Sequence, residues 1–176
     1  MMALLLMCIL VFAVTPLAYS ANLGITRVQQ AYSNWCWAAC SEMAGRLVRG
    51  TGSPNQNAIA SWVMGGTPGN FPASDNEVAS ALAYATNKTV TQSGILAFTA
   101  IEMAVNQGRC MIAKIRWNSS GNHVVVIGGY NPTNVTVWLV DPAAGCSNAS
   151  YSYSALLNGT SIQSGTGSYI RTFSYS

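Results

Sequence analysis

The chain has 176 residues, of which 50% are hydrophobic and only 7% are charged. Ordinary globular domains carry about 25% charged residues, so Ser, Thr, Asn and Gly must provide much of the solvated surface. The net charge is +3, and the basic residues are scattered rather than gathered in a stripe, which argues against nucleic acid as a partner. The length predicts one domain with a substantial hydrophobic core.

Residues 1–20, MMALLLMCILVFAVTPLAYS, have the pattern of a secretory signal peptide. Pro16 interrupts an uncharged apolar run, and small residues precede a predicted cleavage site after Ser20. The run is shorter than the roughly 20 apolar residues that span a bilayer. No Lys or Arg precedes it, so an uncleaved anchor remains an alternative. We expect a secreted protein made of residues 21–176, with no stable membrane association after cleavage.

Helical periodicity dominates the first half of this mature chain. Helices are predicted at residues 36–49, 55–65, 74–87 and 99–109. Ser74 lies three residues before Glu77 and predicts a capping box at the start of the third helix. Thr99 and Glu102 have the same spacing in the fourth helix. The first half is therefore predicted to be mainly helical.

Short runs of β-branched and aromatic residues, separated by Gly, Asn and Pro, dominate that second half. Strands are predicted at residues 110–117, 122–130, 135–142 and 167–176. A block of helices followed by a block of strands favours an α+β fold with an antiparallel sheet against the helices. No repeat or long linker divides residues 21–176, so we expect a single domain.

One histidine and one aspartate occupy the ends of two consecutive predicted strands. His123, the only histidine, begins one strand, and Asp141 ends the next. Taken alone, each has an ordinary explanation, as a half-buried strand residue and as an Asp-Pro turn. If the strands form an antiparallel hairpin through the turn NPTN, these two ends are neighbours. Asp141 can then accept a hydrogen bond from one ring nitrogen and leave the other for a third group.

Cys36 is the candidate for that third group. It lies in NWCWAAC, at the start of the first predicted helix and after an extended arm over residues 21–34. A helix N-terminus and a nearby imidazolium both stabilise a thiolate, although a structural core cysteine would fit this position too. Gln30, six residues earlier, can donate its amide N–H to an oxyanion beside the backbone N–H of Cys36. Gln29 could take this role if the register shifts by one.

The segments QAYSNWCWAAC, NHVVVIGGY and WLVDP together resemble papain-like cysteine peptidases. The match is closest to compact bacterial members, the plant-pathogen effector proteases and the bacteriocin-processing peptidases, and it covers about residues 28–142. The resemblance implies a papain-like fold, with the nucleophile helix packed on a C-terminal antiparallel sheet. The implied roles are nucleophile for Cys36, base for His123, orienting residue for Asp141 and oxyanion donor for Gln30.

The implied function is a secreted cysteine endopeptidase that cleaves peptide bonds through an acyl-enzyme. No metal or organic cofactor is required, the partner is a protein or peptide substrate, and we expect a monomer. Residues 51–72 are expected to help line the cleft. Cys110 and Cys146 are predicted to form a disulfide, and Cys40 to be a buried free thiol.

Four features depart from papain. Cys36 and His123 are only 87 residues apart (123 − 36), and the orienting residue is Asp rather than Asn. No Gly-Ser pair precedes the nucleophile. No inhibitory pro-segment fits between Ser20 and Cys36. The compact relatives share the first three features, whereas the fourth leaves the restraint of activity before secretion unexplained.

Three alternatives use the same residues. A purely structural cysteine framework would make the chain a secreted binding domain. A zinc site made by the four cysteines of residues 21–176 is disfavoured, because the C-x3-C pair lacks a second closely spaced pair. A secreted cell-wall amidase would also use Cys, His and a polar third residue. Gln30 and Trp37 favour the peptidase over the amidase.

Overall fold

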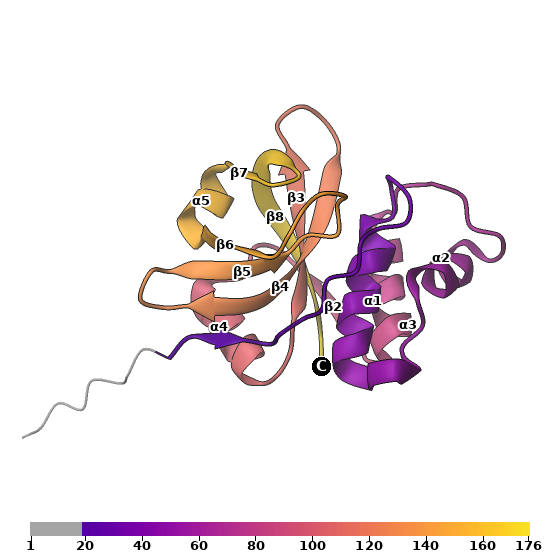
Figure 1. Cartoon of the computed structure of the whole chain (residues 1–176), viewed down its shortest axis with the longest axis horizontal. Helices are drawn as coiled ribbons and strands as arrows, with labels where there is room; N and C mark the ends of the chain where they lie inside the picture. Colours follow the sequence, from indigo (N-terminus) through magenta and orange to yellow (C-terminus); the bar gives the residue numbers. More distant parts are fainter. Residues whose placement is uncertain (1–18) are drawn as a thin grey trace, which may run out of the picture.

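The structure, a computed structural model, describes residues 19–176 (Figure 1). The predicted signal peptide, residues 1–20, lies outside the described residues except for its last two positions. The helices are α1 (Cys36–Arg49), α2 (Gln56–Met64), α3 (Asp75–Thr86), α4 (Phe98–Asn106) and α5 (Tyr153–Asn158), with a 3-10 turn, η1 (Gly50–Gly52), after α1. The strands are β1 (Ala21–Asn22), β2 (Val90–Ser93), β3 (Met111–Trp117), β4 (Asn122–Asn131), β5 (Thr136–Val140), β6 (Ala149–Ser152), β7 (Thr160–Ile162) and β8 (Gly165–Tyr175).

Within residues 19–176 the strands form one eight-stranded antiparallel sheet. Its main path runs β2-β8-β3-β4-β5-β6, with β1 paired to β4 and β7 paired to β8. The last strand, β8, therefore lies between β2 and β3, in the interior of the sheet. Figure 1 shows α1, α2 and α3 gathered on one side of this sheet. The arrangement confirms the α+β fold in which the helix that begins at Cys36 packs against a C-terminal antiparallel sheet.

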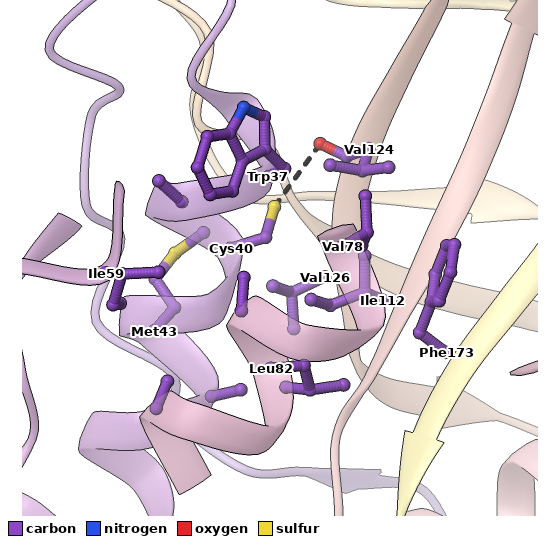
Figure 2. Close-up of a cluster of buried hydrophobic side chains, with 14 of the residues drawn as sticks. Trp37, Cys40, Met43, Ile59, Val78, Leu82, Ile112, Val124, Val126 and Phe173 are labelled. Atoms are coloured by element: carbon purple, nitrogen blue, oxygen red, sulfur yellow. Dashed lines mark hydrogen bonds between the residues drawn. The ribbon is translucent and has the colours of Figure 1, made fainter. Parts of the chain in front are cut away.

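Two hydrophobic clusters form the core, one on each face of the sheet. The first joins α1, α2 and α3 to the inner side chains of β3, β4 and β8, and its labelled members include Trp37, Met43, Ile112 and Phe173 (Figure 2). The second lies on the opposite face, beneath α4 and α5. Alternation along β3 and β4 sends successive side chains to the two clusters, as expected of strands buried on both faces. The sheet is therefore the central layer.

Small residues bring α1 close to its neighbours. Gly45 allows the closest approach, because a Cβ atom there would lie 2.8 Å from the backbone oxygen of Ala85 on α3. Ala38, Ala39 and Ala44 are fully buried along the same helix. Close packing on α3 and the sheet fixes the position of the first turn of α1.

α1 has 14 residues, and none of the helices in the described part of the chain is long and apolar enough to cross a membrane.

The predicted elements are confirmed for α1, α2, α3, α4, β3, β4, β5 and β8, with boundaries shifted by a few residues. Ser74 and Glu77 form the predicted capping box of α3. The capping box predicted at Thr99 is wrong, because α4 begins at Phe98 after an N-cap at Ala97 that makes no side-chain bond. Phe98 packs its ring against the rings of Tyr130 and Tyr153, which fixes the start of the helix.

The arm before α1 lies across β4. Ala21 pairs with Tyr130, and the backbone N–H of Leu23 donates to the carbonyl of Gly128 at 2.8 Å. A Cβ atom at Gly129 would lie 2.7 Å from the backbone oxygen of Ala21, so this close approach requires glycine there. The arm is thereby aligned to deliver residues 27–30 to the loop that follows β5.

Candidate active site

Cys36 is the first residue of α1 and is half-buried. Trp35, at the N-cap, makes no side-chain capping bond, and no acidic residue lies in the first turn. The free backbone N–H groups and the positive end of the helix dipole therefore act on the thiol without a competing carboxylate. Arg46 and Arg49 lie in the last turn, where their positive charges interact favourably with the negative end of the helix dipole. The first turn of α1 is thus suited to hold an anionic sulfur.

The two tryptophans that flank Cys36 connect the start of α1 to the loop before α3. The indole N–H of Trp35 donates to the carbonyl of Gly69 at 2.9 Å, and that of Trp37 donates to the carbonyl of Phe71 at 3.3 Å. Asn34 pairs with Asn70 through two hydrogen bonds of 2.9 and 3.0 Å. Both indoles are almost completely buried. The bulky neighbours of Cys36 therefore fix its position by hydrogen bonding as well as by packing.

Replacing Trp35 with phenylalanine is expected to lower the free energy of unfolding by about 2 kcal/mol. The smaller ring leaves a cavity, and the Gly69 carbonyl loses its hydrogen-bond donor. Urea unfolding followed by circular dichroism would measure the loss. Trp62→Phe is the matched control, since Trp62 is 52% exposed and is expected to change stability little. A Trp35→Phe protein as stable as the wild type would contradict the anchoring role.

His123 and Asp141 are brought together by the β4–β5 hairpin. His123 lies near the start of β4, Asp141 directly follows β5, and Val126 pairs with Val140 between them. The His123 Nε2 atom lies 2.8 Å from Asp141 Oδ1, and both side chains are buried. Trp117, the last residue of β3, stacks on the imidazole with the ring centroids 5.5 Å apart. The indole covers one face of the histidine and shields it from water.

The other neighbour of the imidazole is Cys36. Burial of the ring lowers the pKa of His123, but hydrogen bonds to Asp141 and to the Cys36 side chain, together with the charges of both groups, outweigh it. The net effect raises the pKa of His123 to about 9. Burial raises the pKa of Asp141, yet its bonds to His123, Ser164 and Ala143 outweigh burial and lower it. The pair therefore favours an imidazolium facing a carboxylate at neutral pH.

Three segments hold Asp141 in place. Its Oδ1 atom accepts from the backbone N–H of Ala143 at 3.0 Å, and its Oδ2 atom accepts from the Ser164 hydroxyl at 2.5 Å. Arg27, from the arm, donates through Nε to the Asp141 carbonyl at 2.6 Å and through a terminal nitrogen to the Ala143 carbonyl. The carboxylate thus has donors for both oxygens besides the histidine.

Gln30 lies near this group but does not line the pocket at Cys36. Its backbone N–H donates to the carbonyl of Pro142 at 2.9 Å, which joins the arm to the Asp141 loop. Its side-chain Nε2 donates to the carbonyls of Tyr32 and Ser33 at 3.0 and 2.8 Å. The buried Oε1 atom has no hydrogen-bond partner among residues 19–176. The amide hydrogens are therefore directed at the loop that leads into α1.

The predicted Cys110–Cys146 disulfide is absent, which corrects the sequence analysis. The four cysteines of the described chain are free thiols. Cys110 faces the first core cluster, with its sulfur 3.6 Å from the Tyr175 hydroxyl, whereas Cys146 lies in the loop after β5. Cys40 is fully buried and donates to the carbonyl of Val124 at 3.3 Å (Figure 2). Burial raises the pKa of Cys40 and that of Cys110, the latter to about 11, so both thiols stay protonated.

A pocket of about 490 Å³ opens beside Cys36 and His123. Its walls come from the first turn of α1, the β3–β4 hairpin and the loop before α3. Of the segment 51–72 that was expected to line the cleft, only Pro72 reaches this pocket. Within residues 19–176, no three His, Cys, Asp or Glu side chains lie close enough together to hold a metal ion. The thiol and the imidazole thus face a space that can admit part of a substrate.

A family model described as the Peptidase_C39 like family matches residues 22–167. The chain belongs to the Peptidase_C39-like family. A solved structure described as a C39-like peptidase from Bacillus anthracis has a TM-score of 0.62 and 10% identity, with 90% of this chain and 98% of that chain covered. UfSP from C. elegans has a TM-score of 0.52 and 11% identity, with 94% of this chain and 35% of that chain covered. No curated protein matches the sequence. At these identities the two structures support the fold alone.

Membership of the Peptidase_C39-like family makes the chain a cysteine peptidase, a hydrolase that acts on protein or peptide substrates. This result excludes the alternative that the chain is a non-catalytic binding domain, and it favours a peptidase over an amidase. It also confirms the resemblance to compact bacterial papain-like peptidases.

Sequence reasoning missed three residues around the imidazole of this C39-like peptidase. Trp117 and Ser164 contact His123 and Asp141 directly, and Arg27 holds the loop that carries Asp141. Trp117 ends a predicted strand close to His123, so its position offered a usable signal. Ser164 and Arg27 lie in polar segments without a motif, and only the folded sheet places them at the site.

Proposed function

We propose that this C39-like peptidase is a secreted endopeptidase in which Cys36 is the nucleophile, His123 the acid and base, and Asp141 the residue that orients the imidazole. The observation that carries the proposal is that Cys36 and His123 line the same pocket while His123 Nε2 lies 2.8 Å from Asp141 Oδ1. The three groups have the order and roles that nucleophilic acyl transfer needs.

The proposed reaction has two halves. The Cys36 thiolate attacks the scissile carbonyl, a C–S bond forms, and the C–N bond breaks as protonated His123 gives its proton to the leaving amine. Neutral His123 then takes a proton from water, whose oxygen attacks the thioester carbonyl. Breaking the C–S bond releases the carboxylic acid product and returns the thiolate and the imidazolium.

The negative oxygen formed in each half needs hydrogen-bond donors. The backbone N–H of Cys36, at the open end of α1, is one candidate. Gln30 is the second candidate, and its amide would have to release Tyr32 or Ser33 to serve this role. The unpaired Oε1 atom of Gln30 offers little resistance to such a rotation, because turning the amide breaks no bond at that end.

Secretion remains part of the proposal. It rests on the signal-peptide pattern of residues 1–20 and on the low charge content of the chain. Residues 21–176 would then form the mature domain, a monomer that needs no cofactor for the proposed reaction.

Labelling with an epoxide thiol probe tests the proposal. We expect the probe to modify Cys36 alone among the cysteines, with peptide hydrolysis lost in proportion to the labelled fraction. Peptide mapping by mass spectrometry identifies the modified residue. Casein and peptidoglycan fragments assayed in parallel distinguish a peptidase from an amidase. Full activity after complete labelling of Cys36 would exclude it as the nucleophile.

A further inference from the structure

The pocket beside Cys36 has both polar and apolar walls and one lysine. Trp37 of α1, Val78 of α3, Trp117 of β3 and Val124 of β4 supply apolar surface, and Figure 2 shows three of them, Trp37, Val78 and Val124, close to the Cys40–Val124 hydrogen bond. Of the described residues that line the pocket, Lys114 is the only basic one besides His123, and none is acidic. A cation in a pocket that no acidic side chain lines gives the pocket a charge preference.

Lys114 is largely covered yet incompletely paired. Its side chain is 16% exposed, and its Nζ atom lies 2.6 Å from Asp75 Oδ1. An ammonium has three N–H donors, and this is the one acceptor found for it within residues 19–176. Its other N–H donors have no acceptor among residues 19–176, and Lys114 lines the pocket.

Asp75 neutralises Lys114 only in part, because its carboxylate also pairs with a second cation. Its second oxygen lies 3.2 Å from a guanidinium nitrogen of Arg171, which pairs with Lys114 across β3 and β8. Asp75 is also the first residue of α3, where the helix dipole stabilises its carboxylate. The carboxylate of Asp75 therefore interacts with two cations, Lys114 and Arg171, and with the N-terminus of α3.

The charged residues around Lys114 give this side of the pocket a net positive charge. Arg116 lies two residues along β3 from Lys114, on the same face of the sheet, and is exposed. Glu77 is the nearest further acid in sequence, but its carboxylate is bound to the backbone N–H and hydroxyl of Ser74 in the capping box. The region around Lys114 therefore contains three basic residues and two acidic ones. The carboxylate of one of these acids, Glu77, is bound at the N-terminus of its own helix.

We propose that Lys114 makes this pocket select a substrate residue with an acidic side chain, glutamate above all. The inference rests on the proposed peptidase function and adds a substrate class to it. The methylenes of a glutamate would lie against Trp37, Val78 and Val124, and its carboxylate would accept a hydrogen bond from Lys114 Nζ. Because the pocket borders both Cys36 and His123, the selected residue lies next to the cleaved bond or one position away.

A position-scanning peptide library, cleaved by the purified wild-type protein, tests the preference without any substitution. At one position near the cleaved bond, kcat/KM is expected to be at least about tenfold higher for Glu than for Gln or Leu, since an ionic hydrogen bond contributes this much. The preference should weaken as salt is added. Cleavage with no preference for Glu at any position would overturn the inference.

Variants then assign the preference to one side chain. Lys114→Met should abolish the preference for Glu, so that the ratio of kcat/KM for the Glu peptide to that for the Leu peptide falls to about one, and Lys114→Glu should favour a basic residue instead. Lys88→Met is the matched control, because Lys88 is exposed and lies outside this pocket. A Lys114→Met protein that keeps the Glu preference would overturn the inference. If the wild type cleaves no member of the library, the proposed function itself fails.

Discussion

Replacing Cys36 with alanine is expected to reduce peptide hydrolysis by at least about a thousandfold. No other described cysteine can substitute for it, because Cys40 and Cys110 are buried and protonated and Cys146 lies on a different loop. The free energy of unfolding should change by less than about 1 kcal/mol, since the half-buried thiol leaves only a small void. Initial rates on a fluorogenic peptide and urea unfolding measure the two effects.

Cys146→Ala provides the matched control for this substitution. Its thiol is half-buried like that of Cys36, but it has no place in the proposed chemistry. We expect activity within about twofold of the wild type, a difference of less than 0.5 kcal/mol in the barrier on the scale of about 1.4 kcal/mol per tenfold change. Substantial turnover by Cys36→Ala, or equal loss in both variants, would exclude Cys36 as the nucleophile.

Hydrolysis by the wild type is expected to fall as the pH rises through about 9. His123 has a pKa raised to about 9, so its proton is present below that pH and is lost above it. The leaving amine then has no acid to protonate it. A pH profile of kcat/KM measures the midpoint of this alkaline limb directly.

Asp141→Asn should move that midpoint below 9 and lower kcat/KM at pH 7 by about 100-fold. The amide keeps an oxygen that can accept from His123 but removes the negative charge that strengthens this bond and raises the pKa of His123, while burial continues to lower it. Glu102→Gln, the same change on α4, is the control and should leave the profile unchanged. An alkaline limb that stays at about 9 in Asp141→Asn would show that Asp141 does not set the titration of the imidazole.

The geometry around Cys36 was predictable wherever local rules determine it. Helical periodicity and Gly50 set the limits of α1, and the turn between β4 and β5 predicts that His123 and Asp141 are neighbours. Both inferences depend on short-range structure. They were therefore accessible from the order of residues along the chain.

The supporting contacts depend on long-range pairing and could not be predicted. Ser164 reaches Asp141 only because β7 and β8 fold back onto the central strands, and Arg27 reaches the same loop from 114 residues away. The disulfide prediction failed for a related reason. Counting cysteines does not reveal that Cys110 points into the core below α1–α3 while Cys146 lies beyond β5.

The interior position of β8 has a consequence for when this enzyme can first act. The final strand of the chain is inserted between β2 and β3, so the sheet stays split until residues 165–175 have been synthesised. Pairing between strands that are far apart in the sequence forms slowly. Ser164, whose hydroxyl donates to Asp141, is synthesised immediately before β8. A polypeptide still emerging from the ribosome would therefore carry its thiol without an assembled catalytic centre. The order of synthesis itself delays peptidase activity until β8 has been made.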